Sequence, residues 1–398
     1  LIRLSEQAQA HKPKLAHFSD KVAQYFVAII LVTAIATALY WHQHLPEEAF
    51  WITLSVLVAT CPCALSLATP TALTCATTRL NRDGIMIKSA HVMETMPSIN
   101  CFAFDKTGTL TTGEFTIEGI DIVDCNNSLY SKSDVLAIAA ALESHSEHPL
   151  AKPFAQHRNF NLKTENVVVK SGQGITGLVN NQAYTIGKAS WLLSASAQEQ
   201  NHPFMKASCL LMTKDKVIAA FYLIDKIRDD AKDLINQLNV NHQTLMLSGD
   251  NKHACATVAK QLAIPQYYNS LRASDKIAIL KEHQQQKAIV AMVGDGVNDS
   301  PVFGAAHISM AMGCGTDIAK SGADVILLNN KLASINTLKR VSVKTKRIIF
   351  QNYLWAFGYN AIVLPLAVCG FITPYMAVIG MSASSILVIS NSLRLLKK

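Results

Sequence analysis

The stretch that decides the fold is Asp105-Lys106-Thr107-Gly108-Thr109-Leu110-Thr111, which directly follows the apolar run Cys101-Phe-Ala-Phe. A short apolar run of this kind indicates a buried strand, and an aspartate at its end suits a carboxylate nucleophile. Gly108 lets backbone amides approach a phosphate group, the hydroxyls offer hydrogen bonds, and Lys106 offsets negative charge. An aspartate in a Gly-Thr loop is also a common turn or helix cap, so the surrounding sequence must decide between the two interpretations.

Two further apolar runs, at 243–247 and 288–293, also end on loops that carry an aspartate, Asp250 and Asp295. Helix-like stretches lie between the runs, at 229–238 and 253–262. Strands that alternate with helices predict a parallel sheet with crossover helices, and active sites lie at the carboxyl ends of such strands. Residues 113–219 interrupt this alternation, with short strands expected at 166–170 and 182–186, and they predict an inserted domain.

The loop after the third run reads Gly294-Asp295-Gly296-Val297-Asn298-Asp299-Ser300-Pro301. Its two carboxylates, spaced four residues apart, are hard oxygen ligands of the kind that Mg²⁺ prefers. For either carboxylate alone, a turn with a helix-capping aspartate would be the better interpretation.

These strings together resemble the P-type ATPases. The heptapeptide matches their phosphorylation motif, residues 294–301 resemble their Mg²⁺ hinge motif, and Ser248-Gly249-Asp250 resembles their Thr-Gly-Asp. Lys276 matches the lysine that contacts the phosphoryl group, although Arg272-Ala273 stands where the family usually has a proline. The resemblance implies a haloacid-dehalogenase-like α/β domain with a Rossmann-type parallel sheet, in which ATP phosphorylates Asp105. It also assigns residues to this reaction: Lys106, Thr107, Ser248, Gly249, Asp250 and Lys276 around the nucleophile, and Asp105, Asp295 and Asp299 as ligands of Mg²⁺.

Four apolar stretches flank this central region, at 22–40, 50–78, 348–368 and 374–389. They are uncharged and about long enough to cross a bilayer, whereas buried core helices are usually shorter and carry a polar stripe. Lysines and arginines lie before or after each pair, and the two short connecting loops contain none. The positive-inside rule therefore predicts a multi-pass membrane protein with both termini and the central domains in the cytoplasm. The expected location is the cell (inner) membrane.

The composition agrees with this division. The chain has 398 residues, of which 50% are hydrophobic and 16% charged, which excludes a disordered chain. The net charge of +8 is explained mostly by membrane topology, so no nucleic-acid partner is expected.

Two weak motifs lie in the inserted stretch, Ser146-Glu147-His148-Pro149 and a Gly-rich string from Gly172 to Gly177. Each alone would be a surface histidine or a set of turn glycines. As a pair they resemble the adenine-binding set of the heavy-metal P-type ATPases. The resemblance implies an ATP pocket lined by Glu143, His148, Gly172, Gly174 and Gly187.

The second apolar stretch contains Cys61-Pro62-Cys63. Proline removes a backbone hydrogen bond and kinks a helix, and the two thiolates beside it are soft ligands that select Cu(I), Ag(I) or soft divalent ions. The string resembles the metal site of heavy-metal P-type ATPases, and the copper(I) subgroup carries Tyr-Asn and Met-x-x-Ser-Ser at the places of Tyr359-Asn360 and Met381 to Ser385. Zinc or cadmium pumps would carry charged residues in these spans, so Cu(I) is favoured over Zn²⁺, while Ag(I) stays open. The expected copper site comprises Cys61, Cys63, Met381, Tyr359, Asn360 and Ser385.

The expected function is ATP-driven export of Cu(I), with Mg²⁺ as cofactor and a cytoplasmic copper chaperone and the lipid bilayer as partners. The alternatives are a Zn/Cd or Ag(I) pump, a membrane-tethered phosphatase, and a non-pumping remnant that binds metal and nucleotide. Thr112-Gly113-Glu114 spells the hydrolytic motif of the family, but it lies too close to Asp105 to be the separate actuator loop. We therefore expect the C-terminal part of a longer pump, without its metal-binding module, first spans and actuator domain. The expected divisions are 1–20 as an actuator linker, 21–78 and 347–398 as membrane helices, 79–112 and 220–346 as the phosphorylation domain, and 113–219 as the nucleotide-binding domain.

Overall fold

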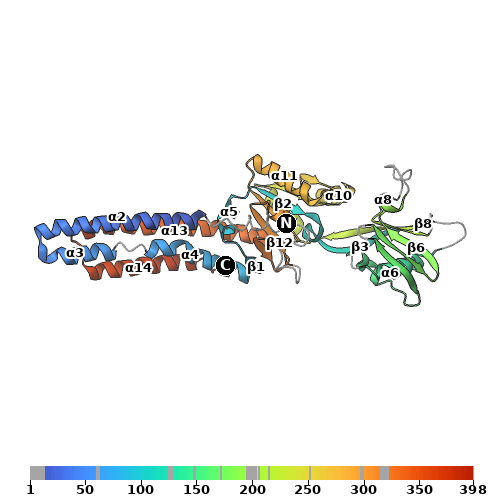
Figure 1. Cartoon of the computed structure of the whole chain (residues 1–398), viewed down its shortest axis with the longest axis horizontal. Helices are drawn as coiled ribbons and strands as arrows, with labels where there is room; N and C mark the ends of the chain where they lie inside the picture. The colour runs from blue at the N-terminus through green and yellow to red at the C-terminus, as the bar shows by residue number, and fades with distance from the viewer. Residues whose placement is uncertain are drawn as a thin grey trace. The chain divides into compact units, whose positions relative to one another are not determined.

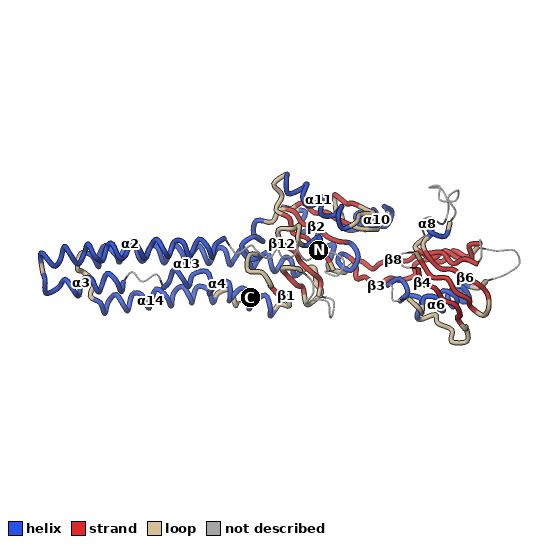
Figure 2. Tube along the Cα trace, in the orientation of Figure 1, coloured by secondary structure: helices blue, strands red, loops and turns tan. Residues whose placement is uncertain are grey.

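The structure is a computed structural model that describes residues 14–59, 63–123, 130–146, 149–170, 173–193, 204, 207–213, 216–250, 252–295, 300–313 and 322–397. The chain forms two compact units. The first contains residues 1–105, 230–250 and 259–398, and the second contains residues 106–229 and 251–258. Figure 2 distinguishes the helical and strand-rich parts of the chain.

Five helices of the first unit form a bundle, namely α2 (Lys14–His44), α3 (Pro46–Ala59), α4 (Cys63–Arg82), α13 (Ser334–Val368) and α14 (Pro374–Leu393). Helices α4, α13 and α14 pack against one another, and α2 packs against α3 and α4 (Figure 1). The turn between α13 and α14 contains Gly370, whose φ of +80° favours glycine. The Trp41 indole of α2 donates a hydrogen bond to the Val368 carbonyl at 3.0 Å, which fixes α2 beside the end of α13.

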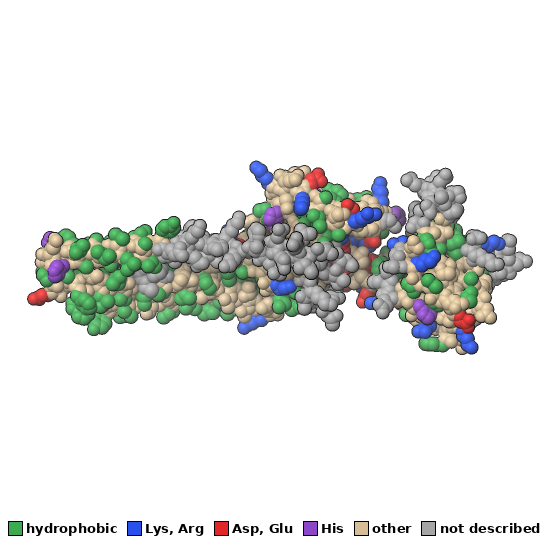
Figure 3. Space-filling view, in the orientation of Figure 1, with side chains coloured by type: hydrophobic (Ala, Val, Ile, Leu, Met, Phe, Trp, Pro, Cys, Tyr) green, Lys and Arg blue, Asp and Glu red, His purple; other side chains and the backbone are tan. Residues whose placement is uncertain are grey.

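The outer surface of this bundle is apolar (Figure 3). Large hydrophobic side chains on four of its helices are exposed, among them Val32, Ile35, Phe50, Leu354, Ile362 and Ile379. Water would not stabilise so extensive an apolar surface, but a bilayer would. Three candidate membrane spans are found among the described residues, at Val27–His44, Pro46–Arg82 and Pro374–Leu393. The sequence predicted four, and the fourth falls in the second half of α13, whose apolarity is reduced by Gln351, Asn352 and Asn360.

The first unit also contains a seven-stranded sheet in the order β1-β13-β12-β11-β2-β9-β10. Its strands are β1 (Ile85–Ile87), β2 (Cys101–Asp105), β9 (Gln243–Leu247), β10 (Gln266–Tyr268), β11 (Val290–Gly294), β12 (Ile308–Met312) and β13 (Val325–Leu327). All neighbours pair in parallel except β1 with β13. The central strands β2, β9 and β11 are almost wholly buried, as expected for a parallel sheet covered on both faces.

Helices connect these strands. They are α5 (Val92–Thr95), the 3₁₀ turn η1 (Met96–Ser98), α9 (Ala231–Asn239), α10 (Lys252–Leu262), α11 (Ala273–Gln285) and α12 (Ser300–Phe303). One face of the sheet buries Ala103, Leu245 and Met292 against Leu280 of α11 and Phe303 of α12. The predicted parallel α/β sheet is thereby confirmed.

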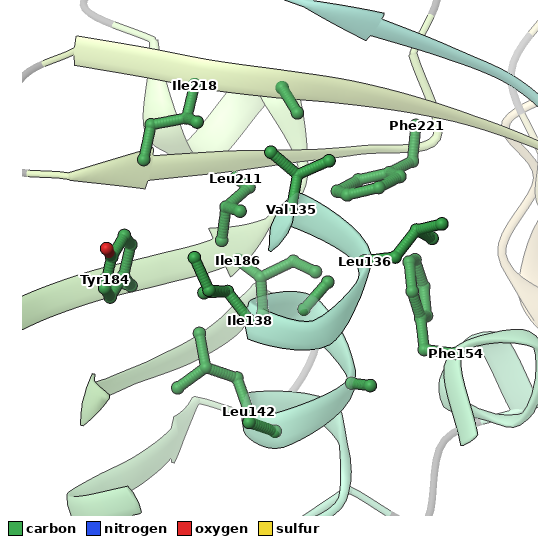
Figure 4. Packing of buried hydrophobic residues seen from close by; sticks show 14 of the residues in the cluster. Val135, Leu136, Ile138, Leu142, Phe154, Tyr184, Ile186, Leu211, Ile218 and Phe221 are labelled. Atoms are coloured by element: carbon green, nitrogen blue, oxygen red, sulfur yellow. The ribbon is translucent and has the colours of Figure 1, made fainter. Parts of the chain in front are cut away.

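The second unit is built on a six-stranded antiparallel sheet in the order β3-β8-β7-β6-β5-β4. The strands are β3 (Thr111–Ile122), β4 (Thr164–Lys170), β5 (Gly174–Val179), β6 (Gln182–Gly187), β7 (Cys209–Thr213) and β8 (Lys216–Ile227). Helix α6 (Lys132–Glu143) packs Val135, Ile138 and Leu142 toward Ile186 and Leu211 of the sheet (Figure 4). The described part of the unit also contains short helices, among them η3 (Pro149–Ala151), α7 (Lys152–Ala155) and α8 (Ala189–Leu192).

Strand β8 is continuous from Lys216 to Ile227, whereas the sequence placed a domain boundary after residue 219. Strand β3 likewise begins at Thr111, before the expected start at 113. Strand β3 thus starts within the phosphorylation motif, and β8 ends beside it, because Ile227 pairs with Thr111. A composition change cannot locate a boundary that falls inside a regular strand.

Candidate functional site

The candidate nucleophile Asp105 is the last residue of β2, the fifth strand of the seven-stranded sheet. In the register of the sheet Asp105 lies opposite Leu247, the last residue of β9, so Ser248 follows at the same edge. On the other side Val293 of β11 lies opposite Phe104, so Asp295 also follows at this edge. Asp105, the loop 248–250 and Asp295 therefore lie at the ends of three adjacent strands, at the same edge of the sheet.

The Lys276 ammonium donates a hydrogen bond to the Asp105 carboxylate at 2.6 Å. Both residues are buried, with 7% and 8% of their surface exposed. A buried charge is costly unless an opposite charge compensates it, so the two side chains stabilise each other in this position. Lys276 lies in the first turn of α11, where the Asp275 carboxylate accepts a hydrogen bond from the Arg272 backbone amide at 2.9 Å and fixes the start of the helix.

The loop that follows Asp105 is held by two side chains of the second unit that lie at the end of β8. The Asp225 carboxylate accepts hydrogen bonds from the Gly113 amide at 2.9 Å and the Thr111 hydroxyl at 2.5 Å. The Arg228 guanidinium donates to the carbonyls of Thr109 at 2.8 Å and Gly108 at 2.9 Å. Neither Asp225 nor Arg228 is among the site residues that the sequence predicted. Their clamp on the phosphorylation loop depends on strand pairing across more than a hundred residues.

Gly108 has a φ of +72°, a conformation that favours glycine and turns the loop after Thr107. Gly113, in the Thr-Gly-Glu string, donates its amide to Asp225 as part of the same clamp. The Glu114 side chain is exposed at the start of β3.

The loop 248–250 is held close to the segment that follows β10. The Ser248 hydroxyl is buried and accepts a hydrogen bond from the Asp250 amide at 3.1 Å, and the Ser270 amide donates to the Asp250 carbonyl at 2.7 Å. A side chain at Gly249 would place its Cβ 3.3 Å from the Leu271 carbonyl oxygen. A side chain at position 249 would therefore need a small shift of this neighbour.

Carboxylate oxygens of Asp105 and Asp295, at the ends of paired strands, are a donor set that fits Mg²⁺. The predicted third ligand, Asp299, lies outside the described residues. Within the described part of the chain no group of three or more acidic, histidine or cysteine side chains forms a complete metal site.

Three of the five predicted ATP-binding residues are described, and all belong to the second unit. Gly174 of β5 lies opposite Gly187 of β6, and the Trp191 ring lies over both, since a Cβ at either position would come within 2.8 Å of it. Glu143 ends α6, and its neighbour Leu142 packs on Gly177 of β5. His148 and Gly172 lie outside the described residues.

Burial raises the pKa of Glu143 to about 7. Within the described part of the chain, no hydrogen bond or ion pair reaches this carboxylate. A half-buried carboxyl group of this kind is available to bind a polar group of a ligand.

In the bundle, the two predicted strings on α13 and α14 face each other. A Cβ at Gly380 would lie 2.6 Å from the Tyr359 hydroxyl, so Tyr359 packs against α14 directly before Met381. Asn360 is buried and donates to the Ala356 carbonyl at 2.9 Å, while its Oδ1 is buried with no hydrogen-bond partner among the described residues. Ser385 is partly buried one turn further along α14.

The remaining predicted metal ligands lie at the boundary of the described residues. Helix α3 ends at Ala59 and α4 begins at Cys63, and Cys61 and Pro62 lie outside the described part, so the kink stays a prediction. Cys63 is disulfide-bonded in the structure. Its sulfur must be reduced before it can act as a thiolate ligand.

A polar network that the sequence did not single out joins α4, α13 and α14. The Asn352 amide donates to the Ala68 carbonyl at 3.3 Å and to the Ser392 hydroxyl at 3.0 Å, and Thr71 lies 3.1 Å from Ser392. Buried polar groups that bond between helices specify their register. The sequence signal that could have revealed this network is the presence of asparagine and serine within apolar stretches.

Comparison with known proteins identifies the class. The model of the haloacid dehalogenase-like hydrolases matches residues 99–307, and the chain belongs to this family. Within it, the chain is a member of the heavy-metal P-type ATPases, as its relatives show. It is 34% identical to the cation-transporting P-type ATPase B of Mycobacterium bovis, over 99% of this chain and 54% of the relative. It is also 34% identical to a copper-exporting P-type ATPase of Mycobacterium tuberculosis, over 100% of this chain and 53% of the relative.

The solved structures agree on the fold. A zinc-transporting PIB-type ATPase in the E2.Pi state matches with a TM-score of 0.77 and 30% identity, over 100% of this chain and 66% of that one. The catalytic domain of the CPx-ATPase CopB-B matches with a TM-score of 0.55 and 29% identity, over 66% of this chain and 98% of that one. The chain spans about half the length of the curated relatives it matches.

Proposed function

We propose that this chain carries the catalytic and ion-binding parts of a pump that exports Cu(I) at the expense of ATP. The observation that carries the proposal is the buried Asp105–Lys276 pair at the carboxyl edge of a parallel sheet that is continuous with an apolar helix bundle. A phosphatase tethered to a membrane would need no polar strings inside its helices. Here Tyr359 and Asn360 on α13 and Ser385 on α14 provide them.

The chemical step is transfer of the γ-phosphoryl group. A carboxylate oxygen of Asp105 attacks the γ-phosphorus, the bond from that phosphorus to the β,γ-bridging oxygen breaks, and ADP leaves. Lys276 and the backbone amides of the loop held by Asp225 and Arg228 offset the charge on the phosphoryl oxygens. Bound Mg²⁺, held by Asp105 and Asp295 with Asp299, would offset further negative charge on the phosphates. Glu143, Gly174 and Gly187, with His148 and Gly172, would hold the nucleotide.

Copper is favoured over zinc as the cargo by the chemistry of the α13 and α14 strings. Met381 offers a neutral, soft thioether. Tyr359 and the Asn360 oxygen, which has no hydrogen-bond partner among the described residues, lie on the facing helix. Helix α14 contains no acidic or basic residue, whereas a site for a divalent ion would be expected to carry charge. A named copper exporter and a named zinc transporter are both among the relatives, so similarity alone does not choose between them.

The test is ATP-driven uptake of Cu(I), Ag(I) and Zn²⁺ into inverted vesicles that contain the full-length protein. We expect Cu(I) uptake that falls about tenfold in Met381→Leu, which keeps the side-chain volume but removes the thioether. Met376→Leu, an exposed methionine at the start of the same helix, is the matched control and should transport normally. Uptake of Zn²⁺ in place of Cu(I), or an unimpaired Met381→Leu variant, would refute the copper assignment.

A further inference from the structure

A basic cavity lies in the first unit where α4, α13 and the C-terminal tail come together. Its volume is about 620 Å³. Five cationic side chains and one carboxylate line it, namely Arg79, Lys331, Arg340, Lys344, Lys397 and Asp83. None of these residues takes part in the proposed phosphorylation, nucleotide or copper sites.

Hydrogen bonds between separate segments build the walls of this cavity. Arg79 is buried, with 8% of its surface exposed, and its guanidinium donates to the Lys397 carbonyl at 2.6 Å and pairs with the Asp83 carboxylate at 2.9 Å. Lys344 donates to the Arg394 carbonyl at 3.0 Å. Ile85, Val341 and Leu395 are buried and form an apolar floor.

The positive charge in the cavity is largely uncompensated. Asp83 is engaged by Arg79, and in the described part of the chain no carboxylate lies within ion-pair distance of Arg340, Lys344 or Lys397. Like charges converging on one cavity repel one another. An anion bound between them would stabilise this arrangement.

The position of the cavity points to the source of that anion. Two candidate membrane spans end at Arg82 and Leu393, directly beside it. On α13, Lys344 precedes the apolar stretch that begins at Ile348 by one helical turn, about 6 Å. Basic pockets between helices at this level of a membrane bind the phosphate of lipid head groups.

We propose that this cavity binds the phosphate group of an anionic membrane lipid, with Arg340 and Lys344 as its principal contacts. The apolar floor receives the part of the lipid next to the phosphate. A bound head group ties the end of α4 to α13 and to the C-terminal tail. Lipid binding in this cavity does not depend on which metal is transported.

The test is native mass spectrometry of the delipidated full chain titrated with phosphatidylglycerol, with phosphatidylcholine, or with soluble glycerol 3-phosphate. Wild type should retain phosphatidylglycerol in preference to the other two. The double variant Arg340→Gln/Lys344→Gln should lose about tenfold or more in affinity, since each cation near a lipid surface contributes several-fold. The charge-conserving double variant Arg340→Lys/Lys344→Arg should keep most of it.

The matched control is Arg82→Gln/Lys346→Gln, which removes two exposed cations at the same level that do not line the cavity. It should bind phosphatidylglycerol within about twofold of wild type. Equal losses in both glutamine double variants would reduce the effect to general surface charge and overturn the proposal. If glycerol 3-phosphate bound as tightly as the lipid, the assignment of a lipid as the ligand would be overturned. If the charge-conserving variant failed to bind phosphatidylglycerol, the proposed electrostatic basis of binding would be overturned.

Discussion

At the scale of single residues, the proposed phosphoryl transfer depends on the charge balance around Asp105. Its carboxylate and the Lys276 ammonium are 2.6 Å apart, with only 11% and 9% of their side chains exposed. Each therefore needs the other while no phosphoryl group is present. A phosphorylated Asp105 would keep a negative charge at the same place, so Lys276 can serve both states without moving far.

Removal of the Lys276 charge should destabilise the sheet. We expect Lys276→Met to lower the free energy of unfolding by about 3 kcal/mol, because it removes the cation that pairs with the buried Asp105 carboxylate. The double variant Asp105→Asn/Lys276→Met should recover part of this loss. Thermal unfolding of the full chain measures both. Additive losses in the double variant would show that the two charges do not interact.

Glu143 predicts a pH dependence of stability. Its pKa is raised to about 7 by burial, above the ordinary value of about 4.3 that it has in the unfolded chain. The stabilising effect of the protonated group is therefore complete below the unfolded pKa and is lost as the pH rises through 7. Glu143→Gln does not titrate, so it should match wild type near pH 4 and exceed it at pH 8, by on the order of 3 kcal/mol. A stability difference that is the same at both pH values would contradict this.

At the scale of elements, the packing of β5 against β6 requires glycine at both Gly174 and Gly187. A Cβ at Gly187 would lie 2.6 Å from the Gln173 carbonyl and 2.8 Å from Trp191. Gly187→Ala should therefore destabilise the second unit by about 1–3 kcal/mol and weaken ATP binding. Gly119→Ala in β3 is the matched control, because its Cβ would meet nothing closer than 3.6 Å. Calorimetry of unfolding and of ATP binding compares the two, and equal effects would argue against the close packing.

The sequence predicted the central strands well, since 101–104, 243–247 and 288–293 are β2, β9 and β11 within two residues. Apolar runs that end on aspartates identify buried parallel strands without any knowledge of their partners. The clamp of Asp225 and Arg228 on the loop, and the network around Asn352, could not be predicted. Both depend on which distant segments the fold brings together. In the sequence, Asp225, Arg228 and Asn352 look like any other polar residues. The alternation of glycine and apolar residues in β5 likewise did not reveal that Trp191 covers the glycines.

At the scale of the whole molecule, the distribution of charge predicts a topology. Cys369 is a free, exposed cysteine in the turn between α13 and α14, which the positive-inside rule places outside the cytoplasm. A membrane-impermeant maleimide should therefore label wild type in intact spheroplasts, and Cys369→Ser should remove that label. Lys281→Cys, in α11 of the phosphorylation domain and introduced into the Cys369→Ser background, should be labelled only after permeabilisation. Labelling of both cysteines from the same side would contradict the predicted topology.

The proposed function requires that Asp105 accepts the phosphoryl group of ATP. The most direct measurement is labelling of the protein with [γ-³²P]ATP, Mg²⁺ and the transported metal, followed by acid quench and hydroxylamine treatment. We predict a metal-stimulated, hydroxylamine-sensitive label that is absent in Asp105→Asn and present in Asp121→Asn, an exposed aspartate of β3. An Asp105→Asn protein that still takes up acid-stable phosphate from ATP would contradict the account.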